Sequence, residues 1–486
     1  MAEAERRAGG DLTRGPIGPT LLKFAAPTLA SSILQSLNGT INAIWVGRFL
    51  GERALAATSN ANMVMFVLTG FVFGFGMAST ILVGQYWGRN DLDQARRVFG
   101  TAIGSFGLIA VVIGAAGYWL SPQILDLLAT PPQATPLALA YLRVIFLAMP
   151  PLLLLALIMT ALRGSGDSLT PLLFMGVAVV LDGALNPVFI RGVGPIPRLG
   201  IAGSATATLI SEYAALIGLI LYIYGRDLPL RLRGGELAYL RSDRAILRTI
   251  VAKGFPIGLQ MIVMSVSSIV LIGLVNREGV ETAAAFGVAM QLWTYVQLPA
   301  MALGAAVSAM AAQNIGAGRW DRVGRITRIG ILQVLVITGA MIAVLALADS
   351  AVLALFIGRD SPALPIARHI HIITIWTFLL FGVMTVLFGT VRANGAVWVP
   401  VIVFVIGLLP VRFCYIFATY AWLHADAIWT SFPITMSVNL CLAGIFYLHG
   451  GWRNARMTLP DARNPAEFTE DALAIREPGG ALNPAG

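Results

Sequence analysis

The sequence predicts an all-α polytopic membrane protein, with twelve transmembrane helices in two pseudo-symmetric six-helix lobes around a central cleft. Of its 486 residues, 57% are hydrophobic and only 12% are charged, about half of the roughly 25% found in soluble domains. Apolar runs long enough to cross a bilayer recur along the chain. The second half also repeats the pattern of the first. These observations exclude a cytosolic enzyme, a disordered scaffold and a secreted disulfide module.

Twelve apolar runs mark the expected helices, and a polar, basic stretch divides them into two sets of six. Each run holds roughly 20 residues, the length needed to cross the hydrocarbon core. Because six is an even number, both halves enter the membrane from the same side. The expected spans lie near residues 19–42, 57–84, 98–120, 136–162, 169–190, 201–224, 249–275, 283–312, 326–347, 365–391, 398–420 and 427–449.

The polar segments around these runs define the expected organisation. Residues 1–16 are polar and lack the apolar core of a signal peptide, so we expect a cytoplasmic N-terminal tail. Residues 17–224 form the expected N-lobe and 249–450 the C-lobe, joined by a basic cytoplasmic loop at 225–248. Residues 451–486 are rich in Pro, Gly and acidic side chains, and we expect a disordered cytoplasmic tail.

The charged residues are distributed as in a membrane protein rather than a nucleic-acid-binding protein. The net charge of +9 comes from 31 arginines and two lysines, nearly all of them between the apolar runs. With the N-terminus inside, 24 basic residues fall on the cytoplasmic side and eight on the opposite side. By the positive-inside rule, both termini are then cytoplasmic. We expect a monomer integral to the cytoplasmic (inner) membrane, surrounded by membrane lipids and without a nucleic-acid partner.

The two halves of the chain match at an offset of about 228 residues. GQYWGRNDLDQARRV begins at Gly84, and AQNIGAGRWDRVGRI begins at Ala312. In these segments Gln85 corresponds to Gln313, and a shared glycine follows three residues later. Since each unit has six spans, the two lobes should be related by an axis along the membrane normal, with a cleft between them.

Several segments together resemble the signature segments of multidrug and toxic compound extrusion (MATE) transporters. They are GRFLGERALAATSNA, GQYWGRNDLDQARRV, ALRGSGDSLTP, LDGALNPVFI and LGIAGSATATLISEY, and the resemblance covers roughly residues 17–450. It implies secondary active multidrug efflux: organic, often cationic compounds leave in exchange for protons or sodium, and two lobes alternate access. Such a protein is not an enzyme and needs no cofactor.

Few polar groups interrupt the apolar runs, so each is a candidate functional residue. Asp182 is the only carboxylate near the middle of an N-lobe span, and Asn186 lies one turn further on the same face. In the first span, Gln35, Asn38 and Asn42 form a single polar stripe. We expect these faces to meet across a polar pocket. Hydrogen bonding between helices would explain the amides equally well.

The resemblance assigns a cation-coupling site to Asp182, Asn186, Asn42 and Thr208. Many prokaryotic members carry an acid where this chain has Asn42, so the site holds a single charge. One carboxylate, two amides and a hydroxyl could bind sodium, but with one charge a proton is the simpler coupling ion and is preferred. Protonation of the acid would let the first helix repack, with Pro27 as the hinge.

The C-lobe has fewer candidates. Met264 stands where sodium-coupled relatives carry a glutamate, while Gln260, Gln291 and Gln297 could line a substrate path or join helices. Arg412 is the sole mid-membrane cation, and we expect it to pair with backbone carbonyls or a carboxylate in a structural role.

Other chemistries have weaker support in the sequence. No Walker-type loop is present for ATP, and His369 and His371 lack a third ligand, so we expect no metal site. A lipid-linked oligosaccharide or polysaccharide flippase of the same fold is an alternative, but it would need a basic cavity. A metabolite exporter of narrow specificity is a further alternative that the sequence does not separate from a multidrug exporter.

Overall fold

The computed structural model describes residues 10–457, except 129, 131–132 and 194–196, and every regular element in this part of the chain is helical. Six long helices form the N-lobe, as expected. They are α2 (Ile17–Leu50), α3 (Glu52–Gly88), α4 (Leu92–Leu127), α5 (Thr135–Gly164), α6 (Leu169–Arg191) and α7 (Ile201–Gly225).

The C-lobe contains the other six membrane-length segments, two of which are interrupted. Its elements are α8 (Arg244–Arg277), α9 (Val280–Gly316), α10 (Trp320–Leu347), α11 (Asp349–Ile357), α12 (Ala363–Thr374), α13 (Thr377–Ala393), α14 (Trp398–Ile406), η2 (Gly407–Val411), α15 (Arg412–Leu423) and α16 (Asp426–His449). Among the described residues, ten helices are long and apolar enough to cross a membrane, and α12 with α13 gives an eleventh. α3, with 37 residues, is also long enough to cross a membrane, and it brings the number of spans to the expected twelve.

Two expected spans are not single straight helices. The span expected at 365–391 bends by 43° between α12 and α13. The span expected at 398–420 is divided by η2, a π-helical segment that contains Pro410. Proline has no N–H to donate and crowds the preceding turn, so it favours an irregular turn inside a helix. The short helix α11 and the 3-10 turns η1 (Gly234–Leu240) and η3 (Gly451–Asn454) are additional elements.

Several helices begin before the apolar run that predicted them. α4 starts at Leu92 because the Asp91 side chain accepts a hydrogen bond from the backbone N–H of Gln94 at 3.1 Å. α8 starts at Arg244 because Asp243 accepts from two backbone N–H groups of its first turn. Such N-caps stabilise a helix end outside the hydrocarbon core.

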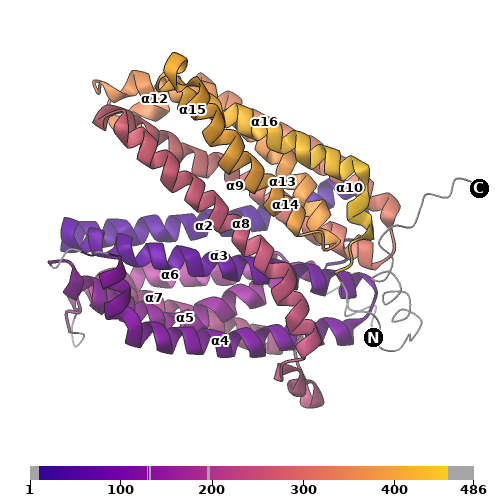
Figure 1. Ribbon diagram of the computed structural model, residues 1–486. Helices are drawn as coiled ribbons and strands as arrows, with labels where there is room; N and C mark the ends of the chain where they lie inside the picture. Colours follow the sequence, from indigo (N-terminus) through magenta and orange to yellow (C-terminus); the bar gives the residue numbers. More distant parts are fainter. Residues whose placement is uncertain (1–9, 129, 131–132, 194–196, 458–486) are drawn as a thin grey trace, which may run out of the picture.

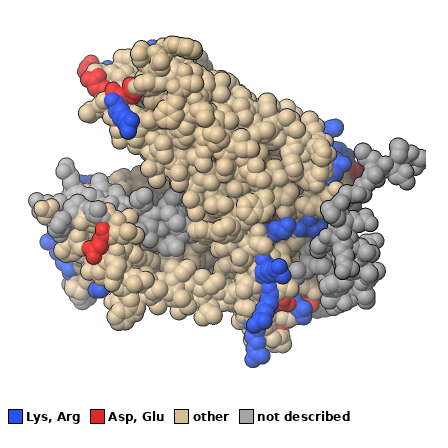
Figure 2. Space-filling model, viewed as in Figure 1, with Lys and Arg blue, Asp and Glu red and all other residues tan. Residues whose placement is uncertain are grey.

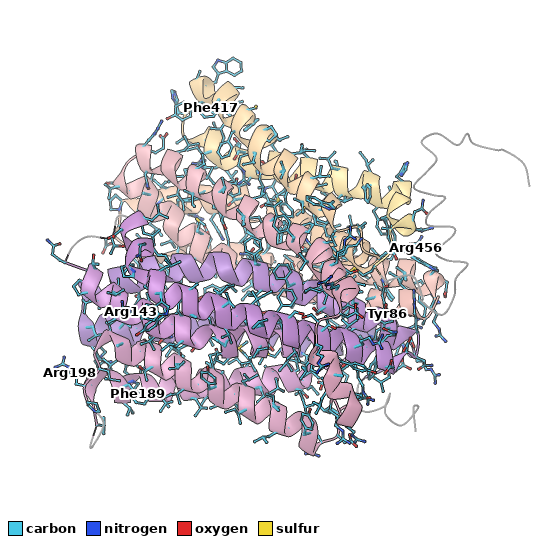
Figure 3. All side chains as sticks on the ribbon, turned by 60° about the horizontal axis from the view of Figure 1, so that its bottom comes forward. Tyr86, Arg143, Phe189, Arg198, Phe417 and Arg456 are labelled. Atoms are coloured by element: carbon cyan, nitrogen blue, oxygen red, sulfur yellow. The ribbon has the colours of Figure 1, made fainter. Side chains whose placement is uncertain are left out.

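The two lobes diverge from the end where the termini lie and leave a V-shaped cleft at the opposite end (Figures 1 and 2). Near the closed end, α3 packs against both α8 and α9, and α2 packs against α9. In Figure 3, Arg143 and Arg198 lie at the open end, whereas Tyr86 and Arg456 lie at the closed end. The closed end therefore carries the segments that the charge bias places on the cytoplasmic side.

Glycines make the close contacts between the lobes possible. A Cβ on Gly74 of α3 would overlap the backbone of α8 at Gly254 and Gly258. At the closed end, a Cβ on Gly88 would overlap the carbonyl of Gln313, and a Cβ on Gly316 would overlap the carbonyl of Gln85. These last contacts are reciprocal, as expected if an axis relates the two lobes.

The described parts of both tails pack against the lobes. Leu12 and Thr13 are buried, and the Leu12 N–H donates to Gln313 Oε1 at 3.0 Å. Trp452 is buried, and its carbonyl accepts from Asn394 Nδ2 at 2.9 Å. The expected disordered tail therefore does not begin at 451, and its remainder, 458–486, lies outside the described residues.

Candidate functional site

Polar side chains from α2, α6 and α7 meet inside the N-lobe. α6 packs against both of the other helices. Asp182 and Asn186 are four residues apart on α6, and Ser204 and Thr208 are four apart on α7, so each pair lies on one face of its helix. Both faces contact Asn42 or one another through hydrogen bonds. These five residues are called the Asp182 cluster below.

Asp182 is at the centre of the cluster, and only 2% of its surface is exposed. Its Oδ2 accepts a hydrogen bond from Asn42 Nδ2 at 3.0 Å. Its Oδ1 accepts one from Thr208 Oγ1 at 3.0 Å and a longer one from Asn186 Nδ2 at 3.3 Å. Donors from three helices therefore converge on one carboxylate. The four residues expected at the cation-coupling site lie together, and their role in coupling stays a prediction.

Asn42 uses both ends of its amide in this network. While its Nδ2 donates to Asp182, its Oδ1 accepts from Asn186 Nδ2 at 2.7 Å and from Ser204 Oγ at 3.1 Å. Ser204 was not predicted, although its spacing of four from Thr208 was a usable signal. The buried Asn186 Oδ1 has no hydrogen-bond partner among the described residues. One acceptor is thus left free inside the cluster.

The other two predicted residues of α2 differ in position: the Asn38 side chain also approaches the Asp182 carboxylate, whereas Gln35 lies outside this centre. Asn38 is half-buried, and its Oδ1 has no partner in the described part of the chain. Gln35 is exposed. The polar faces of α2 and α6 touch directly through Asn42, whereas we expected them to face each other across a pocket. Pro27 is buried in α2, about four turns before Asn42.

The hydrogen-bond pattern fits an ionised carboxylate. Asp182 accepts three side-chain hydrogen bonds, and an ionised carboxylate has acceptors only. A proton on Oδ2 would face the donating Nδ2 of Asn42. Rotating that amide would not solve the conflict, because Asn186 and Ser204 donate to its other end. A proton on Oδ2 therefore conflicts with the present bond between α2 and α6. A proton on Oδ1 would instead face the Thr208 hydroxyl, which can accept it and donate to the Ser204 carbonyl.

A cavity of about 600 Å³ lies where α3 of the N-lobe faces α8, α9, α13 and α14 of the C-lobe. Five methionines and four phenylalanines make up nearly half of the residues that line it. Gln260 and Gln297 line it, which is one of the two roles that the sequence allowed for them. Among the described residues of the lining, Arg392 is the one that is charged. This volume and this mostly apolar wall are typical of a small-molecule site. We call it the C-lobe cavity.

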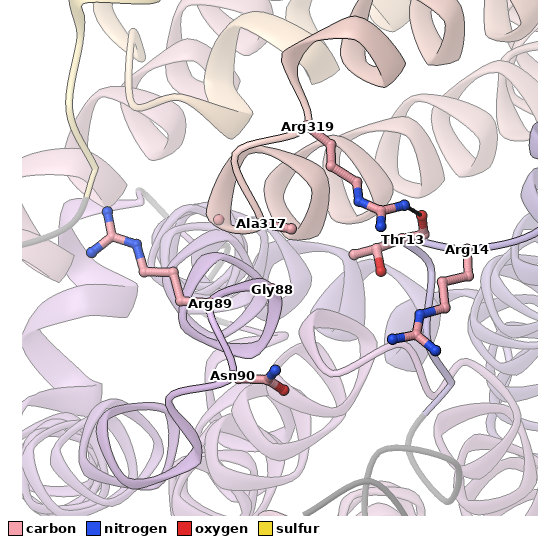
Figure 4. Close-up of a pocket in the computed structure, with 8 residues that line it drawn as sticks. Thr13, Arg14, Gly88, Arg89, Asn90, Ala317 and Arg319 are labelled. Atoms are coloured by element: carbon pink, nitrogen blue, oxygen red, sulfur yellow. Dashed lines mark hydrogen bonds between the residues drawn. The ribbon is translucent and has the colours of Figure 1, made fainter.

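Reciprocal hydrogen bonds hold the lobes together at the closed end. Gln85 Nε2 of the N-lobe donates to the carbonyl of Ala393 at 2.6 Å. Gln313 Nε2 of the C-lobe donates to the carbonyl of Gly164 at 3.0 Å. Beside these bonds, Arg14, Arg89 and Arg319 surround a shallower pocket of about 330 Å³ (Figure 4). The joint between the lobes is thus polar and basic at its surface.

The buried polar groups of the C-lobe differ from expectation at one position. Arg412 is 4% exposed and donates to Ser267 Oγ at 3.3 Å, and its guanidinium lies 4.6 Å from the centre of the Phe432 ring. The expected backbone or carboxylate partner is therefore replaced by a hydroxyl and an aromatic ring. His369 and His371 each pair with an aspartate near the open end.

Comparisons with known proteins agree on one family. The sequence profile of the MatE family matches residues 27–188 and 256–417. The chain is 36% identical to the probable multidrug resistance protein YoeA of Bacillus subtilis, covering 90% of this chain and 94% of that protein. It is 28% identical to an FAD transporter of Shewanella oneidensis, over 64% and 68% of the two chains. An outward-facing MATE transporter structure matches with a TM-score of 0.80 at 21% identity, covering 90% and 97%.

Proposed function

The chain belongs to the MATE family of transporters, and on this premise we propose that it exports lipophilic organic compounds, many of them cationic, in exchange for protons. One observation carries the proposal: the buried carboxylate of Asp182 joins α2, α6 and α7 through side-chain hydrogen bonds. A change in its charge is therefore a change in how the helices of the N-lobe pack.

The proposed coupling step is the protonation of Asp182. In the ionised form, the carboxylate holds Asn42 and with it the middle of α2. Protonation at Oδ2 places a donor against the Asn42 donor, and it removes the negative charge that a bound cation would require. α2 then separates from α6 and bends at Pro27, and the substrate leaves. A proton and a substrate are coupled in this way only if each favours a different state of the N-lobe.

The position of the cleft indicates which side of the membrane the present state opens to. Its open end is opposite to the termini, so with both termini in the cytoplasm the present state faces outward. The inward-facing state requires the bonds of Gln85 and Gln313 to break while the open end closes. We propose that one chain in the cytoplasmic membrane performs the whole cycle, because each lobe and the cleft are built from the same chain.

Sodium is the alternative coupling ion. Carboxylate and amide oxygens suit hard cations, and the free Oδ1 of Asn186 adds an oxygen to those of Asp182, Asn42 and Thr208. Sodium would have to displace the donors that now point at the carboxylate. A proton needs no such coordination shell, so proton exchange is preferred.

The test uses purified protein in liposomes loaded with ethidium. A proton gradient and a sodium gradient are imposed separately on the wild type and on Asp182→Asn. We expect the proton gradient to move ethidium in the wild type and not in the variant. Asp126→Asn is the matched control, since Asp126 is exposed at the end of α4 and should leave proton-driven transport intact.

Two results would change the proposal. Proton-driven transport that persists in Asp182→Asn would remove the coupling role from this carboxylate. Movement driven by sodium alone would move the coupling to the oxygens of Asn186 and Thr208.

A metabolite exporter of narrow specificity is the second candidate. It is favoured by the similarity to a relative named as an FAD transporter. In the same liposomes, FAD would be exchanged for protons while ethidium would not move. Transport of several unrelated compounds would support multidrug export instead.

A further inference from the structure

The C-lobe cavity has a charge opposite to that of the Asp182 cluster. Arg392, near the end of α13, is the one charged residue among those that the structure describes in its lining. Its Nη2 donates to Gln260 Oε1, while its Nε is buried without a partner among the described residues. No carboxylate in the described part of the chain forms an ion pair with it. The cavity therefore holds a positive charge that no described carboxylate neutralises.

The guanidinium of Arg392 is held in a defined position. Gln260 is buried on α8 and accepts from one side. On α13 itself, the ring of Phe388 lies 5.8 Å from the guanidinium carbon and also lines the cavity. An arginine fixed in this way presents planar donors that match carboxylate, sulfonate and phosphate groups.

The charge of the cavity decides which molecule it favours. An organic cation in a cavity of about 600 Å³ would stay close to a like charge in a poorly hydrated site. An organic anion would supply the counter-charge that Arg392 lacks, while the methionines and phenylalanines would contact its apolar body.

We propose that the C-lobe cavity binds soluble, amphiphilic organic anions rather than membrane lipids, with the acidic group on Arg392 and an aromatic or aliphatic body against the apolar wall. This inference rests on the proposed export function and adds a second class of substrate to it. The two lobes would then divide the work: the N-lobe holds the coupling proton, and the C-lobe holds the anion.

The internal repeat provides a control for a purely structural role of this arginine. Arg163 occupies the position in the N-lobe that Arg392 occupies in the C-lobe, in the repeated segments RGSG and RANG. Arg163 also has a buried Nε without a partner in the described residues, but it is not among the residues that line the C-lobe cavity. A role shared by the repeats would affect both arginines, whereas anion binding would affect one.

The test measures binding of two matched fluorescent probes to the purified protein in detergent micelles. Pyrenesulfonate and pyrenylmethyl-trimethylammonium share one ring system and carry opposite permanent charges. Energy transfer from the protein's tryptophans to pyrene reports binding. We expect the wild type to bind the anion about tenfold more tightly than the cation, a difference typical of one charge-assisted hydrogen bond. Equal affinities in the wild type would overturn the proposal without any variant.

Variants then assign the preference to Arg392. Arg392→Met should lower the affinity for the anion about tenfold or more and leave that for the cation equal or higher. Arg392→Lys should keep most of the preference, because the charge remains. Arg163→Met should keep the ratio of the two affinities unchanged. An equal loss for both probes in Arg392→Met, with Arg392→Lys no better, would mean that the residue is structural and the proposal is wrong.

Two further experiments separate this proposal from lipid binding and from the export mechanism. Phosphatidylglycerol carries the same acidic chemistry as a lipid headgroup; if a small mole fraction of it displaced pyrenesulfonate, the cavity would be a lipid site and the proposal would be wrong. Binding needs no ion gradient, so a preference for the anion that persists in Asp182→Asn supports the cavity proposal. Proton-driven transport that persists in the same protein would count only against the export mechanism.

Discussion

Asp182 accepts hydrogen bonds from Asn42, Thr208 and Asn186, and it does so in a site that water barely reaches. A buried acceptor that loses its donor suffers the full cost of desolvation. The individual residues of this cluster therefore contribute to stability in addition to their proposed role in coupling. Measurements must separate the two effects.

Asn42→Leu tests the contact between α2 and α6. It leaves Asp182 Oδ2 without its donor and should lower the free energy of unfolding by about 1–3 kcal/mol. Gln35 lies on the same helix and is exposed, so Gln35→Leu should change the free energy of unfolding by less than about 0.5 kcal/mol. Thermal denaturation in detergent compares the two variants. Equal effects would mean that the Asn42–Asp182 hydrogen bond contributes nothing measurable to the free energy of unfolding.

For individual residues, the sequence predicted the acids and amides of the cluster better than its hydroxyl groups. Asp182, Asn186 and Asn42 were predicted because charged and amide groups are rare in a membrane span. Ser204 was missed because serines are common in such helices and most bond to their own backbone. The partner of Arg412 could not be predicted either, since the choice of Ser267 depends on how α8 and α15 pack.

At the scale of helices, the crossing of α3 and α9 at the closed end depends on a pair of glycines. Gly316→Ala should weaken this crossing by about 1–3 kcal/mol, because its Cβ meets the carbonyl of Gln85 and backbone cannot move away easily. Gly324→Ala on α10 is the control, since nothing lies within 4 Å of its Cβ. We expect the control to gain about 0.5–1 kcal/mol from helix propensity.

Melting temperatures of the two glycine variants check this prediction. A Gly316→Ala protein as stable as the control would show that the lobes do not approach each other so closely at this point.

Hydrophobic runs predicted which helices exist but not where each one ends or bends. Helix ends lie beyond the apolar runs, where caps such as Asp91 extend the helix into polar sequence. The irregular segment η2 had a signal in Gly407 and Pro410. The bend between α12 and α13 had none, because the residues there contain neither proline nor glycine, and packing against other helices determines it.

For the whole molecule, the balance between outward-facing and inward-facing states depends on few side-chain bonds. Replacing both Gln85 and Gln313 by alanine removes two bonds between the lobes, each worth about 1 kcal/mol. The equilibrium should then shift roughly thirtyfold toward the state that is closed at the opposite end. The repeat in the sequence predicted that these glutamines correspond, but not that each would reach across to the other lobe.

Spin labels across the mouth of the cleft would detect this shift. Labels at Arg198→Cys and Phe417→Cys, after Cys414 and Cys441 are replaced by serine, lie on opposite lobes at exposed positions. The double glutamine variant should gain a population with a shorter distance between the labels. Gln123→Ala, exposed on α4, should not. An unchanged distance distribution would mean that other contacts hold the closed end.

The charge of the substrate also has a consequence for the whole transport cycle. With one proton exchanged per molecule, export of a monovalent cation moves no net charge, whereas export of a monovalent anion moves two positive charges inward. Each charge moved is worth about 2.3 kcal/mol per 100 mV. A membrane potential, negative inside, should therefore accelerate export of pyrenesulfonate and leave export of the matching cation unchanged. Potassium-valinomycin potentials applied to proteoliposomes measure this, and an equal response of both probes would contradict it.

The central claim is that a substrate and a proton exclude each other through Asp182, and proton release on substrate binding tests it most directly. Ethidium is added to the purified protein in weakly buffered solution between pH 5 and 8, and a pH indicator counts the protons released. The wild type and Asp126→Asn should release protons when ethidium binds. Asp182→Asn should release none, even at ethidium concentrations high enough to offset the weaker binding expected without the carboxylate. Equal proton release from wild type and Asp182→Asn would contradict the account.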